Sequence, residues 1–230
     1  LLNIQALDTS SVSLPAYVST LLMQEMSLFK DWLIDAKLGL SLSDEESQGL
    51  SACLSLLEER ALAQHQVTVH RDFHARNLMI CDDDELGIID FQDAVVGPAT
   101  YDLVSLLRDC YIVWPSELVH DWCREFYDLA LKKQVSTANL LGSFANFKED
   151  FDLMGLQRHI KVAGIFARLS LRDGKHGYLA DIPRTLEYIL TVSQQLLGAS
   201  PAKFQNLTPL VHLIEHKVLP LTKHELFLKE

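Results

Sequence analysis

Apolar residues recur at intervals of three or four through most of the chain, which is the spacing of a helix that buries one face. The first full series begins after Ser13 and Pro15 and ends at Gly39, a residue type that commonly stops a helix. A capping box at Ser43 opens the next helix, because the side chains of Ser43 and Glu46 can each accept the other's backbone N–H. The pattern predicts a short helical segment at residues 1–7 and helices at 13–38, 43–64, 103–109, 116–134, 144–171, 183–196 and 201–218.

Shorter apolar runs between these helices have the length and composition of strands. They cover residues 67–69, 78–81 and 86–89, and an acidic turn at 82–84 joins the last two into a hairpin. Gly97-Pro98 predicts a further turn. The predicted fold class is therefore α+β and mostly α: a helical lobe that carries a small β-hairpin, spans residues 1–218 and is followed by a loose tail at 219–230.

Polar residues that suit phosphoryl transfer lie at the ends of the predicted strands. Asp72 follows the first strand, Asn77 comes five residues later, and Asp90 ends the third strand. The order matches a kinase catalytic loop and its metal-binding aspartate, with His-Arg-Asp-Phe-His-Ala-Arg-Asn at 70–77 and Ile-Asp-Phe at 89–91. In that template Asp72 orients or deprotonates the attacking hydroxyl, while Asn77 and Asp90 supply oxygen ligands for Mg²⁺. We expect the hairpin to bring the three side chains to one edge.

Composition and charge narrow the possible functions. The 20 Lys and Arg are outnumbered by 31 Asp and Glu, and a net charge of −11 argues against a nucleic-acid-binding surface, which needs a basic footprint. No apolar stretch reaches the length of a membrane span, and the four cysteines lack metal-ligand or redox spacing, so we expect a cytoplasmic protein with reduced thiols. The chain begins without Met and carries no Gly-rich loop or strand Lys before residue 67. We therefore expect an interior fragment that lacks the nucleotide-binding lobe and has no kinase activity by itself.

The segments with the most specific sequences are Leu-Pro-Ala-Tyr at 14–17, Val-His-Arg-Asp-Phe at 69–73, Arg-Asn-Leu-Met at 76–79, Ile-Asp-Phe-Gln-Asp-Ala at 89–94, Tyr-Asp-Leu-Val-Ser-Leu-Leu-Arg-Asp at 101–109 and Asp-Leu-Met-Gly-Leu-Gln-Arg-His at 152–159. Through these segments the chain resembles the aminoglycoside phosphotransferase (kinase-like) superfamily. More narrowly, it is similar to the N-acetylmuramate/N-acetylglucosamine anomeric kinases of bacterial cell-wall recycling. The resemblance implies the C-terminal lobe of a kinase-like fold, ATP and Mg²⁺ as cofactors, and transfer of the γ-phosphate to the anomeric hydroxyl of an amino sugar. It implies Asp72 as the catalytic base and Asn77 and Asp90 as metal ligands.

Other polar residues near these motifs have two interpretations each. Asp93 is either a second metal-proximal carboxylate or a polar residue of a turn. We expect His70 to support the site by hydrogen-bonding the backbone near Asp90. Asp102 opens a helix and so is a candidate cap, whereas the resemblance implies that it braces the catalytic loop; both roles are structural.

Substrate contacts are expected from the loop and from two helices. His74 and Arg76 lie inside the catalytic loop and face either the acceptor, a phosphate or solvent. Glu25 lies on the first long helix, where it is a candidate for lining a sugar site. Arg158 and Arg168 lie on a later helix and would meet a carboxylated sugar, although a charged stripe is more often a solvated or salt-bridged face.

Three functions remain open at this point. Only residues 91–101 separate Asp90 from Asp102, with no room for the activation loop and Ala-Pro-Glu signature of a protein kinase, so a small-molecule acceptor is favoured. The first hypothesis is the catalytic lobe of an amino-sugar kinase. The second keeps the chemistry but takes an aminoglycoside or a choline-like amino alcohol, and predicts acidic residues near Asp72. The third is a truncated, non-catalytic binding module.

Overall fold

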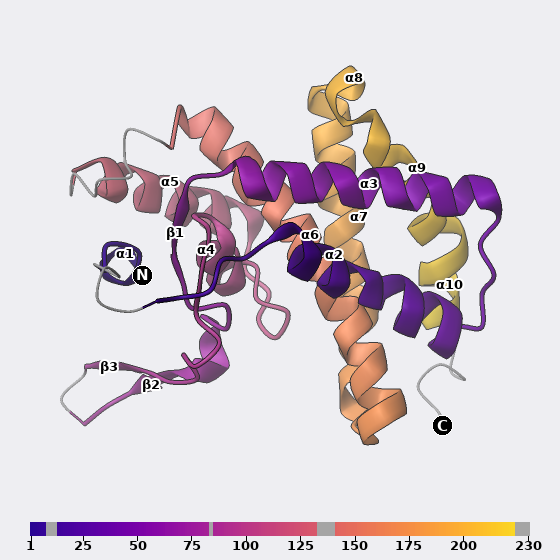
Figure 1. Ribbon diagram of the computed structural model, residues 1–230, viewed down its shortest axis with the longest axis horizontal. Coiled ribbons are helices and arrows are strands. Elements are labelled where there is room, and N and C mark those ends of the chain that lie inside the picture. Colours follow the sequence, from indigo (N-terminus) through magenta and orange to yellow (C-terminus); the bar gives the residue numbers. More distant parts are fainter. Residues whose placement is uncertain (8–12, 83–84, 133–140, 224–230) are drawn as a thin grey trace. The chain divides into compact units, whose positions relative to one another are not determined.

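The computed structural model describes residues 1–7, 13–82, 85–132 and 141–223. The chain forms two compact units: unit 1 comprises Leu1–Ser19 and Arg60–Gly155, and unit 2 comprises Thr20–Glu59 and Leu156–Glu230. Helices predominate in the described residues and the strands pair in two small antiparallel sheets, which confirms the predicted class, α+β and mostly α. In chain order (Figure 1) the elements are α1 (Leu2–Gln5), α2 (Ser19–Leu28), η1 (Phe29–Lys37), α3 (Asp44–Ala63), β1 (Gln66–Val69), η2 (Ala75–Asn77), β2 (Leu78–Ile80), β3 (Leu86–Ile88), β4 (Val95–Pro98), α4 (Tyr101–Leu107), α5 (Ser116–Lys132), α6 (Phe144–Asp173), η4 (His176–Asp181), α7 (Ile182–Ala199), α8 (Pro201–Phe204), η5 (Gln205–Leu207), α9 (Thr208–Leu213), η6 (Ile214–Val218) and α10 (Leu219–Thr222).

In unit 1, β1 and β4 pair in a sheet that the sequence pattern did not reveal. The strands are antiparallel, with Val67 opposite Gly97 and Val69 opposite Val95. The prediction of a turn at Gly97-Pro98 was therefore wrong. Glycine gives close packing here, because a Cβ on Gly97 would lie 3.2 Å from the Cβ of Tyr17, tighter than most such contacts.

The start of the first long predicted helix is also wrong, because residues 15–17 are extended. The Tyr17 N–H donates to the Val96 carbonyl and the Val96 N–H donates to the Pro15 carbonyl, both at 2.8 Å. The Tyr17 side chain is buried and meets Tyr101 edge to face, with ring centroids 5.5 Å apart. This pairing with a distant strand overrides the local helical spacing, and the helix begins only at Ser19.

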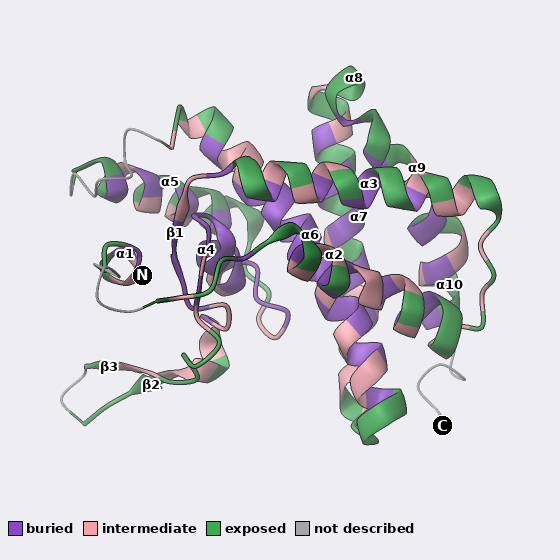
Figure 2. Ribbon diagram, in the orientation of Figure 1, coloured by how far each residue is buried: buried purple, intermediate pink, exposed green. Residues whose placement is uncertain are grey.

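The predicted hairpin is present, as a short ribbon made by β2 and β3. Leu78 lies opposite Ile88 and Ile80 opposite Leu86, so the two strands are shorter by one residue each than predicted. Residues 83–84 of the predicted turn lie outside the described residues. Figure 2 shows exposed positions on both strands of this ribbon, whereas β1 is mostly buried.

Two helices of unit 1 were located closely by their periodicity. The helix α4 begins two residues before the predicted start and buries most of its side chains. The helix α5 begins at the predicted Ser116, and residues 133–134 of its predicted end lie outside the described residues.

Unit 2 confirms the predicted capping box and helix stop. The Ser43 N–H donates to Glu46 at 2.9 Å, and the Glu46 N–H donates to the Ser43 hydroxyl at 3.2 Å. The first long helix passes from the α-helix α2 into the π-helix η1 before Gly39, whose φ is +63°. A Cβ on Gly164 of α6 would clash with the Leu28 carbonyl group, so only glycine allows these two helices to pack this closely.

The C-terminal region departs from the single helix predicted at 201–218. It is divided into short segments, three of which, α8, α9 and α10, begin at or next to a proline that lacks a backbone N–H to continue the preceding helix. The helix α10 lies inside the predicted loose tail and buries Thr222, while residues 224–230 lie outside the described residues. None of the described helices is long and apolar enough to cross a membrane.

Candidate active site

The predicted catalytic loop, residues 70–77, is fixed at its start by a buried carboxylate. Asp102 lies in the first turn of α4, where its Oδ2 accepts the His70 backbone N–H at 2.7 Å and its Oδ1 accepts the Arg71 N–H at 3.0 Å. The φ of Arg71 is +74°, a left-handed conformation that a non-glycine residue keeps only where its surroundings hold it. These two bonds hold the bend immediately before Asp72. They are the bracing contact that the resemblance implies for Asp102.

A second buried carboxylate holds the later part of the loop, and the sequence analysis missed it. Asp109 follows α4 and accepts the Ala75 N–H on Oδ2 at 3.1 Å. Its Oδ1 accepts the Tyr111 N–H at 2.9 Å, and the residue is 1% exposed. Asp109 ends one of the segments that carry the family resemblance and follows an apolar helix seven residues after Asp102, but neither feature assigned it a role. Both ends of the loop are therefore tied to the two ends of one helix.

The structure brings Asn77 to both Asp72 and Asp90. The Asn77 Nδ2 donates to the Asp72 backbone carbonyl at 3.0 Å and to the Asp90 Oδ2 at 3.3 Å. The Gln92 Nε2 donates to the other Asp90 oxygen at 2.8 Å. Asp90 also has a positive φ, +72°, at the point where the chain leaves β3. Arg71 and Asp90 are the non-glycine residues with positive φ in the described part of the chain, and both adjoin or belong to this cluster.

The donor set fits a hard divalent cation. Because both Asn77 Nδ2 contacts are to acceptors, the amide oxygen Oδ1 is left available as a ligand beside the Asp90 carboxylate. Within the described ranges no three His, Cys, Asp or Glu side chains form a closed metal cluster. Mg²⁺ commonly takes only one or two protein ligands and completes its shell with waters and nucleotide phosphates. An amide and a carboxylate oxygen therefore suit this ion better than they suit Zn²⁺, which prefers nitrogen and sulfur.

The structure contradicts the expected role of the His70 ring and does not test the metal-proximal role of Asp93. His70 does not make the hydrogen bond expected of its ring: both imidazole nitrogens are buried and have no partner among the described residues. The ring instead packs edge to face against Phe73, and His70 joins the hydrogen-bond network through its backbone N–H. Asp93 is exposed in the turn after Asp90, so its predicted place near the metal stays a prediction.

The side chains of His74 and Arg76 flank one aromatic ring, that of Tyr111. The Arg76 guanidinium lies over the ring with its carbon 3.5 Å from the centroid. The His74 ring meets Tyr111 edge to face at 5.7 Å. Tyr111 was not among the predicted site residues, because nothing in its local sequence places it beside the catalytic loop.

The remaining predicted substrate residues belong to unit 2. The Glu25 carboxylate accepts a hydrogen bond from Lys161 at 2.9 Å, so it is neutralised within its own unit. Arg158 is buried and Arg168 is partly exposed on α6. A sugar-binding role for the three residues stays a prediction.

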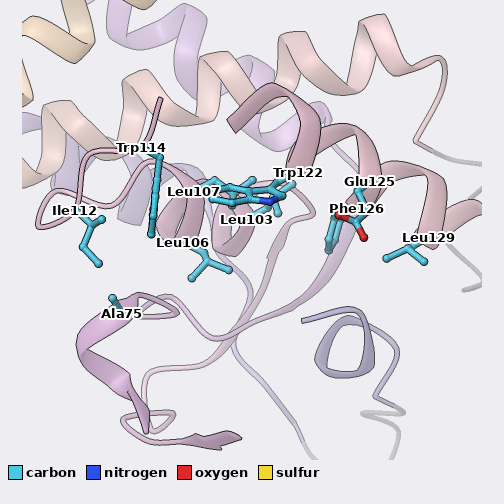
Figure 3. A pocket seen from close by; sticks show the side chains of 10 residues that line it. All are labelled: Ala75, Leu103, Leu106, Leu107, Ile112, Trp114, Trp122, Glu125, Phe126 and Leu129. Carbon is cyan, nitrogen blue, oxygen red and sulfur yellow. The ribbon is translucent and has the colours of Figure 1, made fainter. Parts of the chain in front are cut away.

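An apolar pocket of about 400 Å³ adjoins the catalytic loop in unit 1. Figure 3 shows Ala75 on the side of the loop that faces Leu106 and Ile112. The Trp114 and Trp122 rings form a corner, 5.3 Å apart and at 86° to each other. Ligand pockets for small molecules commonly measure about 300–1,000 Å³ and are mostly apolar with a few polar groups.

Comparison with known proteins places these features in a family context. Residues 1–131 match the profile of the phosphotransferase enzyme family. The chain is 41% identical over 188 residues to the N-acetylmuramate/N-acetylglucosamine kinase of Pseudomonas putida KT2440, an alignment that covers 82% of this chain and 53% of that protein. Proteins of the same name from Pseudomonas aeruginosa PAO1 and Neisseria meningitidis serogroup B are 41% and 42% identical, over 83% and 82% of this chain and 55% of each relative. The chain thus spans about half the length of the curated relatives it matches.

Proposed function

This chain belongs to the phosphotransferase enzyme family, and from that premise we propose that it carries the catalytic loop and the metal ligands of an ATP-dependent amino-sugar kinase. The acceptor is the anomeric hydroxyl of N-acetylmuramate or N-acetylglucosamine, the sugars that appear in the names of its relatives. The chain is the C-terminal, catalytic lobe of a kinase-like fold and works in the cytoplasm. Its nucleotide-binding lobe is supplied by residues other than these 230.

One observation carries this proposal: the joint position of Asn77 and Asp90 beside the loop that holds Asp72. The Asn77 amide donates to the Asp72 backbone carbonyl and to the Asp90 carboxylate, which supports a site in which the proposed base and the two proposed metal ligands lie close together. Phosphoryl transfer needs this combination, because catalysis depends mainly on positioning and on neutralising phosphate charge. A family member that had lost phosphoryl transfer would have no reason to retain this combination of Asp72, Asn77 and Asp90.

Each residue has a role that follows from its atoms. Asp72 accepts a hydrogen bond from the acceptor hydroxyl and so orients it toward the terminal phosphate; because an anomeric hydroxyl is more acidic than an ordinary alcohol, full proton abstraction is less important than orientation. Asn77 Oδ1 and an Asp90 oxygen hold Mg²⁺, which when bound supplies charge neutralisation at the phosphate oxygens. Asp102 and Asp109 keep the loop backbone in place without touching substrate.

The test is an assay of the complete gene product with ATP, Mg²⁺ and a panel of acceptors. We expect phosphorylation of N-acetylmuramate and N-acetylglucosamine at the anomeric position. Turnover of aminoglycosides or choline alone would favour the amino-alcohol alternative, and no turnover of any acceptor would leave only a binding module.

Two variants assign the roles within that assay. Asp72→Ala should lower kcat at least about a hundredfold, the usual contribution of a positioned acid–base group. Asn77→Ala should raise the Mg²⁺ concentration needed for half-maximal rate. Asp82→Ala, in the exposed part of the hairpin, is the matched control and should behave as wild type.

A further inference from the structure

Arg76 carries a positive charge that the described structure does not neutralise. The side chain is exposed, and no hydrogen bond or ion pair joins its guanidinium to a described residue. Its face is occupied by the Tyr111 ring. A guanidinium stacked on an aromatic ring keeps its N–H donors free around its edge, in the fork geometry that matches a carboxylate or phosphate.

A second stacked arginine in the same unit has a guanidinium that is paired with a carboxylate. Arg124 lies over the Phe144 ring at 4.5 Å, and its Nε donates to the Asp128 carboxylate at 3.3 Å. Arg124 therefore has its charge balanced within α5. Arg76 is stacked on a ring in the same way. Among the described residues, however, no carboxylate pairs with Arg76 as Asp128 pairs with Arg124.

The position of Arg76 is also fixed before any ligand arrives. Three successive loop residues are tied to the Asp109–Tyr111 segment: the His74 ring packs on Tyr111, the Ala75 N–H bonds to Asp109, and Arg76 stacks on Tyr111. A side chain that is already ordered loses less conformational entropy on binding.

The surroundings explain why a cation is useful at this place. Arg76 lies between Asp72 and Asn77 in the loop, and Asp90 lies within hydrogen-bond reach of Asn77. An acceptor that bears its own negative charge would be repelled by these carboxylates and by the nucleotide phosphates. A fixed guanidinium on the same loop offsets that repulsion over the short range in which charges act in salt solution.

The apolar pocket lies next to the stacked pair of Arg76 and Tyr111. Its wall begins at Ala75, which precedes Arg76, and at Ile112, which follows Tyr111 (Figure 3). The corner of Trp114 and Trp122 gives it aromatic faces, and Glu125 gives it one carboxylate. Aromatic faces accept the C–H groups of a sugar ring, and a carboxylate accepts its hydroxyls.

We propose that Arg76, stacked on Tyr111, binds the carboxylate of an N-acylated amino-sugar acceptor, while the adjoining Trp114–Trp122 pocket holds that acceptor's uncharged face. This inference rests on the proposed function. It adds that the Arg76 side chain distinguishes an acidic from a neutral acceptor. Arg76 is thus a specificity residue, and Trp114 contributes to the binding of both acceptors.

The experiment compares N-acetylmuramate, which carries a carboxylate, with N-acetylglucosamine, which does not, in the complete gene product. For Arg76→Gln we expect the ratio of kcat/KM for the acidic over the neutral sugar to fall about ten- to hundredfold, the value of one charged hydrogen-bonded pair. Arg76→Lys keeps the charge but loses the stacked guanidinium, so its ratio of kcat/KM should lie between those of wild type and Arg76→Gln. Arg124→Gln is the matched control and should leave the ratio unchanged. An equal loss for both sugars, or no loss, overturns the proposal.

Two further measurements separate the possible sources of the anion and the two parts of the site. If Arg76 binds a nucleotide phosphate instead, Arg76→Gln raises the KM for ATP with either sugar, and the proposal fails. Tyr111→Phe keeps the ring and should preserve the ratio better than Tyr111→Leu. Trp114→Ala should raise the KM of both sugars alike; an effect on the acidic sugar alone would contradict the assigned division of the site.

Calorimetric titration without ATP keeps the inference testable if the proposed reaction fails. Each sugar is titrated onto wild type and Arg76→Gln. A loss of affinity confined to N-acetylmuramate supports the carboxylate site even where no turnover is found. Failure of wild type to bind N-acetylmuramate, or equal binding by both proteins, overturns it.

Discussion

The catalytic loop and the β2–β3 ribbon both contribute to the candidate site, but they are held in place very differently. The loop carries Asp72 and Asn77, and its backbone is tied to Asp102 and Asp109, which are at most 1% exposed. The ribbon delivers Asp90 and has three residues in each strand. Its large apolar side chains face outward: those exposed by half or nearly so include Met79, Ile80, Leu86, Ile89 and Phe91.

This difference shows that buried groups hold the loop, whereas the ribbon is exposed and rests on its base. A two-stranded ribbon is only marginally stable in water by itself, so the ribbon depends on its base, where the Ile89 N–H donates to the Asn77 carbonyl at 3.2 Å. Asp72, the proposed base, Asn77, a proposed metal ligand, and Arg76 thus lie on a loop whose backbone is held by buried carboxylates. The second proposed ligand, Asp90, is held at the surface by Asn77 and Gln92.

The largest effect is expected for Asp102→Asn, which removes the brace of the loop. The carboxylate accepts two backbone N–H groups, whereas an amide of the same shape has one acceptor and would turn its NH₂ group toward the other N–H. We expect the free energy of unfolding to fall by about 3 kcal/mol, because a buried donor loses its partner. Urea denaturation of the chain measures this change.

The control for Asp102→Asn is Asp93→Asn, an identical change at an exposed position that should cost less than about 0.5 kcal/mol. Equal stability of Asp102→Asn and wild type would show that the loop does not depend on this carboxylate.

A smaller effect is expected for Asp109→Asn. Here one of the two hydrogen bonds is local, to Tyr111 two residues on, and only the bond to Ala75 joins distant parts of the chain. We expect a loss of about 1–2 kcal/mol in the same measurement. Asp121→Asn on α5, whose side chain is 74% exposed, is the control. A loss as large as that of Asp102→Asn would mean that the two ends of the loop are held equally.

The sequence was sufficient wherever local spacing decides the structure. The helices α3, α4 and α5, the capping box at Ser43 and the hairpin were all located to within two residues, because each depends on neighbours along the chain. The approach of the Asn77 side chain to the Asp90 carboxylate and to the Asp72 backbone was also expected from the loop length and the hairpin, whereas the meeting of the Asp72 side chain with the other two stays a prediction.

The remaining features depend on contacts between distant segments. The strand β4 and the extended residues 15–17 exist because β4 pairs with β1 and because Val96 bonds to Pro15 and Tyr17, contacts that no local pattern encodes. The Asp109–Tyr111 support of the catalytic loop joins residues more than thirty positions apart, and so does the Lys161–Glu25 pair that occupies a predicted sugar contact. The residue types show that these side chains are polar, but they do not show which partner each side chain contacts.

The smallest effect is expected on the ribbon, where Ile80 is 83% exposed. Ile80→Thr keeps a β-branched residue in the strand and removes little buried apolar surface, so the free energy of unfolding should change by less than about 0.5 kcal/mol. The matched change in the sheet of unit 1 is Val69→Thr, which puts a hydroxyl at a position with 0% exposure and should cost about 1–3 kcal/mol. Urea denaturation of the two variants compares the regions directly. If Ile80→Thr proves as costly as Val69→Thr, the ribbon is packed against a partner surface in solution, and Asp90 is then as firmly placed as Asp72.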